Sequence, residues 1–295
     1  MSDTYLVIGA GGTQGGAVAR RLLRDGHRVR GFGRSTAGPS GVDWVRGDLA
    51  DPAAVRAAFD GVTRASVTLP MEFEPAAVAR HVDNIVAAAD GLERLVYNTG
   101  NRIPVARTGV AAFESKRDAV EAFLSSGVPT IVLRPPVYLD NLAAPWARAA
   151  LANGFLPYPL PEGHRVAWLA HDDLGALTAA AFDRDDLTGT AIDVGGRDAV
   201  TGPELAAAFA SVLGREIRYV SVHADTYEEE MAPVLGAAVA AGVADTYRWL
   251  AAPEGIGLYE GDADKVEALF GVELTPLRTW IERNIRTERN AGAML

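Results

Sequence analysis

The stretch Val7-Ile8-Gly9-Ala10-Gly11-Gly12-Thr13-Gln14-Gly15-Gly16-Ala17-Val18 decides the fold class of this chain. Residues 5–8 have the apolar pattern of a strand, and residues 15–24 have the apolar spacing of a helix. Glycines between them allow a tight turn and a close approach to a pyrophosphate, which free amides and the positive end of the helix stabilise. The loop therefore predicts dinucleotide binding. Its expected cofactor contacts are Gly9, Gly11, Gly12, Thr13, Gln14 and Gly15.

Short β-branched runs alternate with longer helical patterns through the first 134 residues. Strands are expected at residues 5–8, 28–32, 43–45, 65–69, 94–98 and 130–133, and helices at residues 15–24, 52–59, 74–89 and 112–125. Strands joined by helices of this length pair in parallel through right-handed crossovers. The pattern predicts an α/β fold with a doubly wound parallel sheet.

The regular alternation ends at residue 134. Pro135, Pro136, Pro145 and the proline-rich run 155–161 interrupt helices. A strand near residues 190–194 is expected to return to the main sheet, and Thr201 is expected to cap a helix over 203–213. Residues 231–249 and 263–286 have largely helical patterns. We therefore predict a nucleotide-binding domain over 1–134 and a mainly substrate-binding lobe over 135–295.

Composition excludes several classes of function. The 295 residues carry a formal net charge of -10, are 48% apolar and contain no cysteine. These values exclude thiol chemistry and disulfides, and disfavour binding to a phosphate backbone. No apolar run is long enough to span a bilayer, no secretory signal is evident and no histidine pair has metal-ligand spacing. We expect a cytoplasmic monomer or homodimer that acts on a small molecule, with no metal, membrane or nucleic-acid partner.

The segment after the second expected strand indicates which dinucleotide is bound. An NAD site usually has a carboxylate there, whereas this chain has Arg34 and Ser35, which suit a 2′-phosphate. Arg34 as a solvated loop residue is the alternative, and NADP(H) is favoured. After the third strand, Asp48 either accepts a hydrogen bond from the adenine amino group or only orders the turn, with Leu49 beside it.

These segments together resemble the NmrA-like family of atypical short-chain dehydrogenase/reductases. The matching motifs are the glycine loop, Arg34, the run 47–49 with Asp51, Ser115-Lys116, the run 126–135, Tyr138 with Asn141, the run 173–175 and the run 201–205. The resemblance implies a Rossmann domain with a small substrate lobe. It also implies an NADPH-dependent reductase or a non-catalytic NADP sensor. The wider superfamily pairs a Tyr with a Lys four residues later, but here Ala112 precedes Lys116.

Lys116 is the leading catalytic candidate, because the resemblance places it at the nicotinamide ribose, where it orients the ribose or assists proton transfer. A surface lysine near Glu114 is the alternative. Thr99, at the end of the fifth strand, is expected either to contact the cofactor or substrate or to serve only as a strand residue. Tyr138 is the third catalytic candidate.

Residues that follow the strands are candidates for the nicotinamide and substrate pocket. Leu69, Pro70 and Met71 are expected beside the nicotinamide ribose. The expected substrate-pocket residues are Met71, Phe73, Tyr97, Tyr138, Asn141, Phe155 and Trp168. His164 or His171 as a general acid is a weaker hypothesis, and Asp173 is expected to cap a helix.

The favoured function is hydride transfer from NADPH to a small conjugated or carbonyl compound, such as a quinone, an enone or an aromatic polyketide intermediate. Ala112 in place of the usual Tyr keeps a non-catalytic NADP(H) sensor or scaffold as an alternative. A non-redox isomerase or cyclase on the same fold is a further alternative. Residues 236–244 are either a packing helix or a mobile lid.

Overall fold

The computed structural model describes residues 3–286, and the chain divides into two compact units. One unit contains the residues up to Pro135 together with His171–Asp193 and Phe270–Val272. The other contains Pro136–Ala170, Val194–Leu269 and the residues that follow Val272. Each unit has its own set of strands and helices and is described separately.

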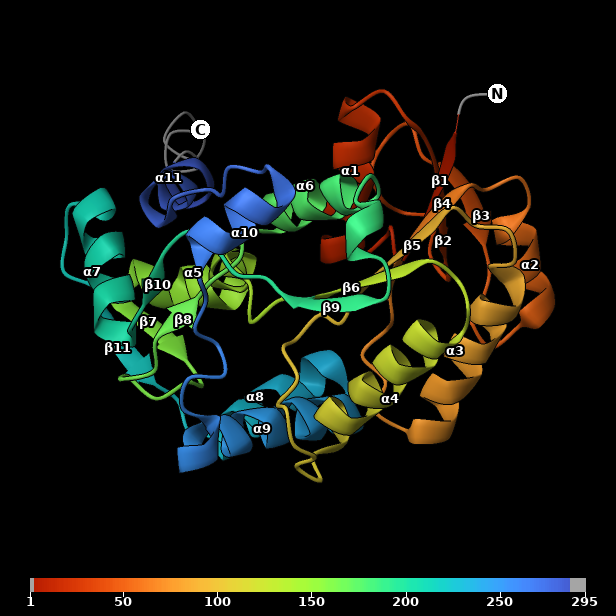
Figure 1. Ribbon diagram of the computed structural model, residues 1–295. Helices are drawn as coiled ribbons and strands as arrows, with labels where there is room; N and C mark the ends of the chain where they lie inside the picture. Colours follow the sequence, from red (N-terminus) through yellow and green to blue (C-terminus); the bar gives the residue numbers. More distant parts are fainter. Residues whose placement is uncertain (1–2, 287–295) are drawn as a thin grey trace. The chain divides into compact units, whose positions relative to one another are not determined.

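The first unit is built on a seven-stranded sheet in the order β3-β2-β1-β4-β5-β6-β9, in which every pair is parallel (Figure 1). Its strands are β1 Thr4–Ile8, β2 Arg28–Gly33, β3 Asp43–Arg46, β4 Arg64–Thr68, β5 Arg94–Asn98, β6 Thr130–Arg134 and β9 Thr190–Asp193. The strand order reverses between β1 and β4. The predicted doubly wound sheet is confirmed, and its switch point lies where such sheets bind ligands.

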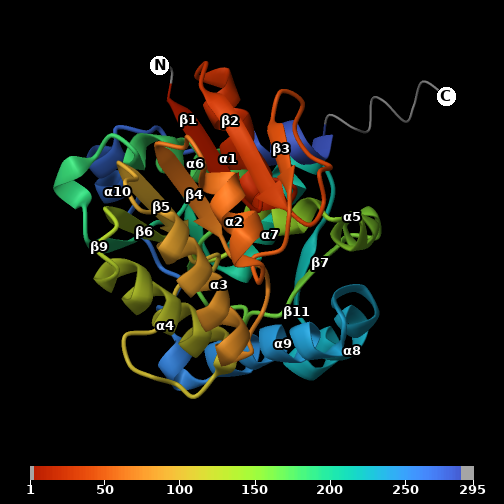
Figure 2. The same ribbon diagram turned by 90° about the vertical axis from the view of Figure 1, so that its right-hand side faces the viewer.

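Helices cover both faces of this sheet (Figures 1 and 2). They are α1 Thr13–Arg24, α2 Pro52–Phe59, α3 Pro75–Ala88, α4 Ala111–Ser125 and α6 His171–Ala181, with a 3-10 turn η2 at Asp185–Leu187. On one face, α2, α3 and α4 bury a core that includes Val55, Ile85 and Phe123. On the other face α1 packs against α6, where a Cβ on Gly175 would lie 2.8 Å from the Ala17 carbonyl oxygen. Sequence reasoning assigned only the strand near 190–194 to this sheet, whereas α6 also belongs to this unit.

The second unit has two small sheets surrounded by helices. β7 Phe155–Tyr158 pairs in parallel with β11 Arg218–Ser221, and β8 Val166–Ala167 pairs antiparallel with β10 Ala199–Val200. The helices are α5 Pro145–Ala152, α7 Gly202–Leu213, α8 Ala224–Leu235, α9 Ala237–Ala251, α10 Ala263–Phe270 and α11 Leu277–Ile281. Shorter helical segments are η1 Leu139–Ala143, η3 Pro253–Gly255 and η4 Glu282–Arg286. Thr201 caps α7 in a capping box with Glu204, as the sequence predicts.

The two ranges predicted to be largely helical, 231–249 and 263–286, are helical over most of their length, and each contains a break. In the first range α8, which begins at Ala224, is separated from α9 by Gly236, whose φ of +85° ends α8. In the second range α10 ends at Phe270, Gly271 follows with a φ of +65°, and helical structure resumes at Leu277. Glycine adopts such angles without steric cost, so it ends helices that apolar spacing alone extends. α9 buries Ala240 and Ala244 completely, and the mobile lid stays a prediction.

Candidate functional site

The glycine loop between β1 and α1 is a tight turn without room for side chains. Gly9 has a φ of +83°, and its carbonyl oxygen accepts a hydrogen bond from the Gly12 amide at 2.9 Å. A Cβ on Gly15 would lie 2.3 Å from the Gly9 carbonyl oxygen, and one on Gly11 would lie 2.9 Å from the Ala37 carbonyl oxygen. Glycine is therefore sterically required at positions 11 and 15, and the backbone itself forms the surface of the loop.

The amino end of α1 is suited to an anion. Gly12 is the N-cap, no side chain caps the helix, and no acidic residue occupies its first turn. Its first amides and the positive end of the helix dipole are therefore not neutralised by a carboxylate. Gln14 lies against the end of β5, where its Oε1 accepts a hydrogen bond from Asn98 Nδ2 at 2.8 Å. The loop and helix end thus fit a pyrophosphate.

Arg34 and Ser35 follow β2 and are exposed. The Arg34 guanidinium has no hydrogen bond or ion pair among residues 3–286, although the Arg34 carbonyl accepts one from Arg46 Nε at 3.2 Å. Ser35 Oγ accepts a hydrogen bond from the Ala37 amide at 3.1 Å. Hydrogen bonds thus fix the backbone of this segment, while the Arg34 guanidinium stays available to an anionic ligand. This arrangement fits a 2′-phosphate.

The segment after β3 is ordered by its own carboxylates. Asp48 Oδ1 accepts a hydrogen bond from the Ala50 amide at 2.9 Å, and Asp51 caps α2 by accepting from Ala53 and Ala54. The carbonyl of the buried Leu49 accepts a hydrogen bond from Asn84 Nδ2 of α3 at 2.8 Å. One oxygen of Asp48 therefore orders the turn, and the contact with adenine stays a prediction.

Lys116 reaches from α4 to the carboxyl end of β5. Its Nζ donates a hydrogen bond to the Thr99 carbonyl oxygen at 2.8 Å. Burial of the ammonium lowers its pKa to about 8. Lys116 is half-buried, and the nearby Glu114 is bound by Arg107, Arg117 and Thr108, so the alternative of a surface lysine near Glu114 is wrong. Ala112 is 2% exposed and supplies no proton donor beside this lysine.

Tyr97 of β5 and Thr99, which follows this strand, are both buried. Tyr97 was expected in the substrate pocket, whereas Thr99 was expected either to contact a ligand or to serve only as a strand residue. The Thr99 side chain is buried, and its hydroxyl donates to the Asn101 carbonyl at 2.7 Å. Tyr97 is 1% exposed and its ring centroid lies 4.9 Å from that of Phe123, inside the core beneath α4. Alternation along a strand sends successive side chains to opposite faces, and Tyr97 falls on the face covered by α2, α3 and α4.

The side chains of the segment after β4 differ in their exposure to solvent. Leu69 packs against the core of the first unit, whereas Pro70 is exposed and Phe73 is half-buried. The Met71 side chain is 56% exposed. Met71 is thus accessible to a ligand, and its contact with the nicotinamide ribose stays a prediction.

The four remaining pocket candidates belong to the second unit, where two are buried, one is half-buried and one is exposed. Tyr138 is 3% and Trp168 4% exposed, so they are core residues on the present geometry, whereas Phe155 is 45% exposed. Asn141 Nδ2 donates to the Tyr158 hydroxyl at 3.1 Å, and the Tyr247 and Tyr158 hydroxyls are also 3.1 Å apart. Sequence reasoning missed this tyrosine pair because its members are 89 residues apart and neither lies in a motif.

The histidine candidates have no demonstrated catalytic geometry. Burial lowers the pKa of His164, which favours its neutral form. His171 and Asp173 are buried in the first turn of α6. Within residues 3–286 there is no cluster of three potential side-chain ligands for a metal ion. No helix in that range has the length and apolar character needed to cross a membrane.

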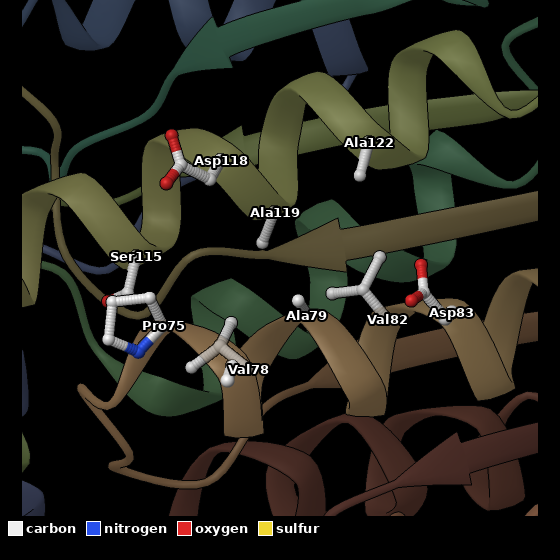
Figure 3. A pocket seen from close by; sticks show the side chains of 10 residues that line it. Pro75, Val78, Ala79, Val82, Asp83, Ser115, Asp118, Ala119 and Ala122 are labelled. Atoms are coloured by element: carbon white, nitrogen blue, oxygen red, sulfur yellow. The ribbon is translucent and has the colours of Figure 1, made fainter.

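A groove of about 350 Å³ lies between α3 and α4 (Figure 3). It is lined by Pro75, Ala76, Val78, Ala79, Val82, Asp83, Ser115, Asp118, Ala119 and Ala122. Its lining is mostly small and apolar, and it contains no cation or histidine. Because none of the glycine-loop residues lines it, this groove is separate from the candidate dinucleotide site.

The sheet order and the glycine loop define a Rossmann-fold protein of the doubly wound class. The chain matches the NmrA-like family over residues 1–282 and belongs to that family. The resemblance noted in the sequence is thereby confirmed.

Individual relatives span nearly the whole chain. A protein named NAD(P)H azoreductase from Xenophilus azovorans is 28% identical over 291 residues, which cover 94% of this chain and 95% of the relative. The structure of Citrobacter sp. triphenylmethane reductase complexed with NADP(H) superposes with a TM-score of 0.75 at 20% identity, covering 96% of this chain and 100% of the other. The negative transcriptional regulator NmrA, in complex with NADP, gives a TM-score of 0.74 at 18% identity, covering 100% of this chain and 99% of that chain.

Proposed function

We propose that this protein is an NADPH-dependent reductase of a small conjugated or carbonyl compound. The observation that carries the proposal is the uncapped amino end of α1 behind a loop in which Gly11 and Gly15 leave no space for a Cβ. The named azoreductase and the NADP(H) complex of a related fold support the same cofactor class. Bound NADPH would supply the hydride.

The chain's own residues would hold and orient that cofactor. The amides at the start of α1 would bind the pyrophosphate, and Arg34 would bind the 2′-phosphate through charge-assisted hydrogen bonds. Lys116, fixed by the Thr99 carbonyl at 2.8 Å, would place a cation at the end of β5. A preorganised cation there orients the ribose and stabilises negative charge that develops on the substrate. With a pKa of about 8, the same ammonium is also able to donate a proton near neutral pH.

A panel of quinones, enones and azo compounds tests the activity. Purified protein should oxidise NADPH, followed by its absorbance, at a rate above background with at least one member of the panel. Tight NADPH binding without oxidation by any compound would contradict the reductase proposal and leave the binding proposal intact.

Substituting Arg34 tests the preference for NADPH. Because Arg34 is the cation expected at the 2′-phosphate, Arg34→Ala should weaken NADPH binding about 10- to 100-fold, as expected for one or two charge-assisted hydrogen bonds. NADH binding should change less than threefold. Dissociation constants from the fluorescence of the reduced nicotinamide measure both values. Equal losses for the two cofactors would show that Arg34 supports the fold and does not read the phosphate.

A non-catalytic NADP(H) sensor is the second candidate, and Ala112 in place of the usual Tyr favours it. The NmrA regulator shares the fold, but at 18% identity it indicates the fold alone. A sensor should bind NADP⁺ and NADPH to form complexes that differ in affinity for a protein partner. Turnover with any compound of the panel, without such a partner, would exclude a purely non-catalytic role.

A further inference from the structure

His81 is a titratable residue on α3 that the sequence motifs leave without a role. Its side chain is half-buried, and its Nδ1 is buried without a hydrogen-bond partner among residues 3–286. Burying a polar nitrogen without a partner costs about 1–3 kcal/mol. A polar atom of this kind next to a ligand site is a candidate for contact with the ligand.

The position of His81 on α3 links it to the adenosine side of the dinucleotide site. Asn84 lies three residues later, on the same helix face, and donates its hydrogen bond to the Leu49 carbonyl at 2.8 Å. This bond holds α3 against the segment that follows β3, and His81, less than one turn before Asn84, interacts electrostatically with Asp48 of that segment.

Four charged side chains act on the His81 imidazole. Asp48 after β3 and Glu72 after β4 favour its protonated form, whereas Arg80 of α3 and Arg34 after β2 disfavour it. His81 therefore lies within electrostatic range of both residues expected at the adenosine 2′-phosphate end of the cofactor. Sequence reasoning had no signal for this, because four separate segments bring the charges together.

We propose that His81 is part of the 2′-phosphate subsite and distinguishes NADP(H) from NAD(H) by taking up a proton when the phosphate binds. The inference rests on the proposed cofactor function. No bond is made or broken, and the proton comes from solvent.

Electrostatics determines the direction of the effect. In the free protein, burial is the largest influence and lowers the pKa of His81, so the imidazole is neutral at pH 7. A phosphate dianion at Arg34 would offset the guanidinium and add negative charge, which raises the His81 pKa in the complex. The added affinity is then full below the free-state pKa and is lost as the pH rises through the complex-state pKa. NAD(H) lacks the phosphate and gains nothing.

The direct test is a proton NMR titration of the five histidine ring resonances in the intact protein. His81→Gln identifies the His81 signal by its disappearance. Saturating NADP⁺ should shift the midpoint of this signal upward by about one pH unit, equivalent to a tenfold change in proton affinity, whereas NAD⁺ should leave it unchanged. An unchanged midpoint in a protein saturated with NADP⁺ would overturn the inference and leave the proposed function standing.

NADP⁺ affinities of the wild type and of histidine variants at two pH values separate the protonation of His81 from that of the phosphate, which itself titrates near pH 6. His81→Gln should lose up to about 10-fold in NADP⁺ affinity at a pH below the free-state midpoint measured by NMR and match the wild type at pH 8.5, in line with a pKa shift of about one unit. His223→Gln is the matched control, because His223 is exposed and lies in the second unit. Equal losses at both pH values would show a structural role and contradict the inference. Failure of the wild type to bind NADP⁺ would refute the proposed function and this inference together.

Discussion

Gly15→Ala is expected to abolish cofactor binding, with a loss of affinity of at least about 100-fold, or more than 2.7 kcal/mol. The new Cβ would lie 2.3 Å from the Gly9 carbonyl oxygen, 2.6 Å from its carbon and 3.0 Å from the Ala10 nitrogen. All three are backbone atoms, so no side chain is able to move aside. The turn must open, and the amides at the start of α1 then lose their common direction.

The same substitution is expected to lower the free energy of unfolding by about 2–4 kcal/mol, since overpacking at a backbone contact has no simple relief. Gly12→Ala is the comparison within the loop. Gly12 has a φ of -86°, and among residues 3–286, its chain neighbours and nearby helix backbone aside, an added Cβ would have only the Gly9 carbonyl oxygen within 4 Å, at 3.4 Å. Its cost should stay below about 1 kcal/mol. Urea unfolding and cofactor titration measure both variants, and equal losses would contradict this account of the loop.

The first unit was predictable because its signals are local. The apolar runs of β1 and β4, and the glycines that end α1 and α2, specify strands and helix ends within a few residues. The parallel order then follows from connection rules that do not depend on side-chain detail. The return of α6 to this unit was missed, since 35 residues of the second unit separate His171 from Pro135, and so was that of Phe270–Val272.

The site was less predictable because its polar contacts are tertiary. Spacing placed Lys116 on a helix face, but its bond to the Thr99 carbonyl and its burial depend on the meeting of α4 with β5. Tyr97 and Thr99 looked like ligand contacts from their position at a strand end. In the structure Tyr97 packs against Phe123, and the Thr99 hydroxyl donates to the Asn101 carbonyl, both inside the protein. No sequence pattern predicts either contact.

The second unit was less predictable than the first for the same reason, because its contacts are tertiary. Tyr158 contacts Tyr247 and Trp168 through edge-to-face packing, and these partners come from different segments of the second unit. Aromatic residues there have no period that identifies which are buried. Of the aromatic pocket residues predicted in this unit, Tyr138 and Trp168 are therefore buried in the structure, whereas Phe155 is exposed.

Lys116→Met is expected to separate catalysis from stability. Methionine keeps an unbranched chain of similar length but removes the charge. If the cation orients cofactor or substrate, kcat/KM should fall about 100- to 1,000-fold, the range for one charge-stabilising or proton-transferring group. In the wild type, kcat/KM should fall as the pH rises through about 8, because the ammonium form is then lost. A pH profile of NADPH oxidation, with a compound that the protein reduces, measures both.

The same variant should be more stable than the wild type at pH 7, although it is less active. Folding lowers the Lys116 pKa from 10.5 to about 8, so the folded state holds fewer protons between these values. The charged lysine therefore destabilises the fold below pH 8, and this cost disappears as the pH rises to 10.5. After allowing for its half-buried position and the lost bond to Thr99, Lys116→Met should gain about 1–2 kcal/mol at pH 7. Urea unfolding of both proteins at pH 7 and pH 10 measures this gain, which should be smaller at pH 10. A variant that loses both activity and stability at pH 7 would show that Lys116 is a structural residue. A stable, inactive variant would instead show that this chain retains a destabilising buried cation because its function requires one.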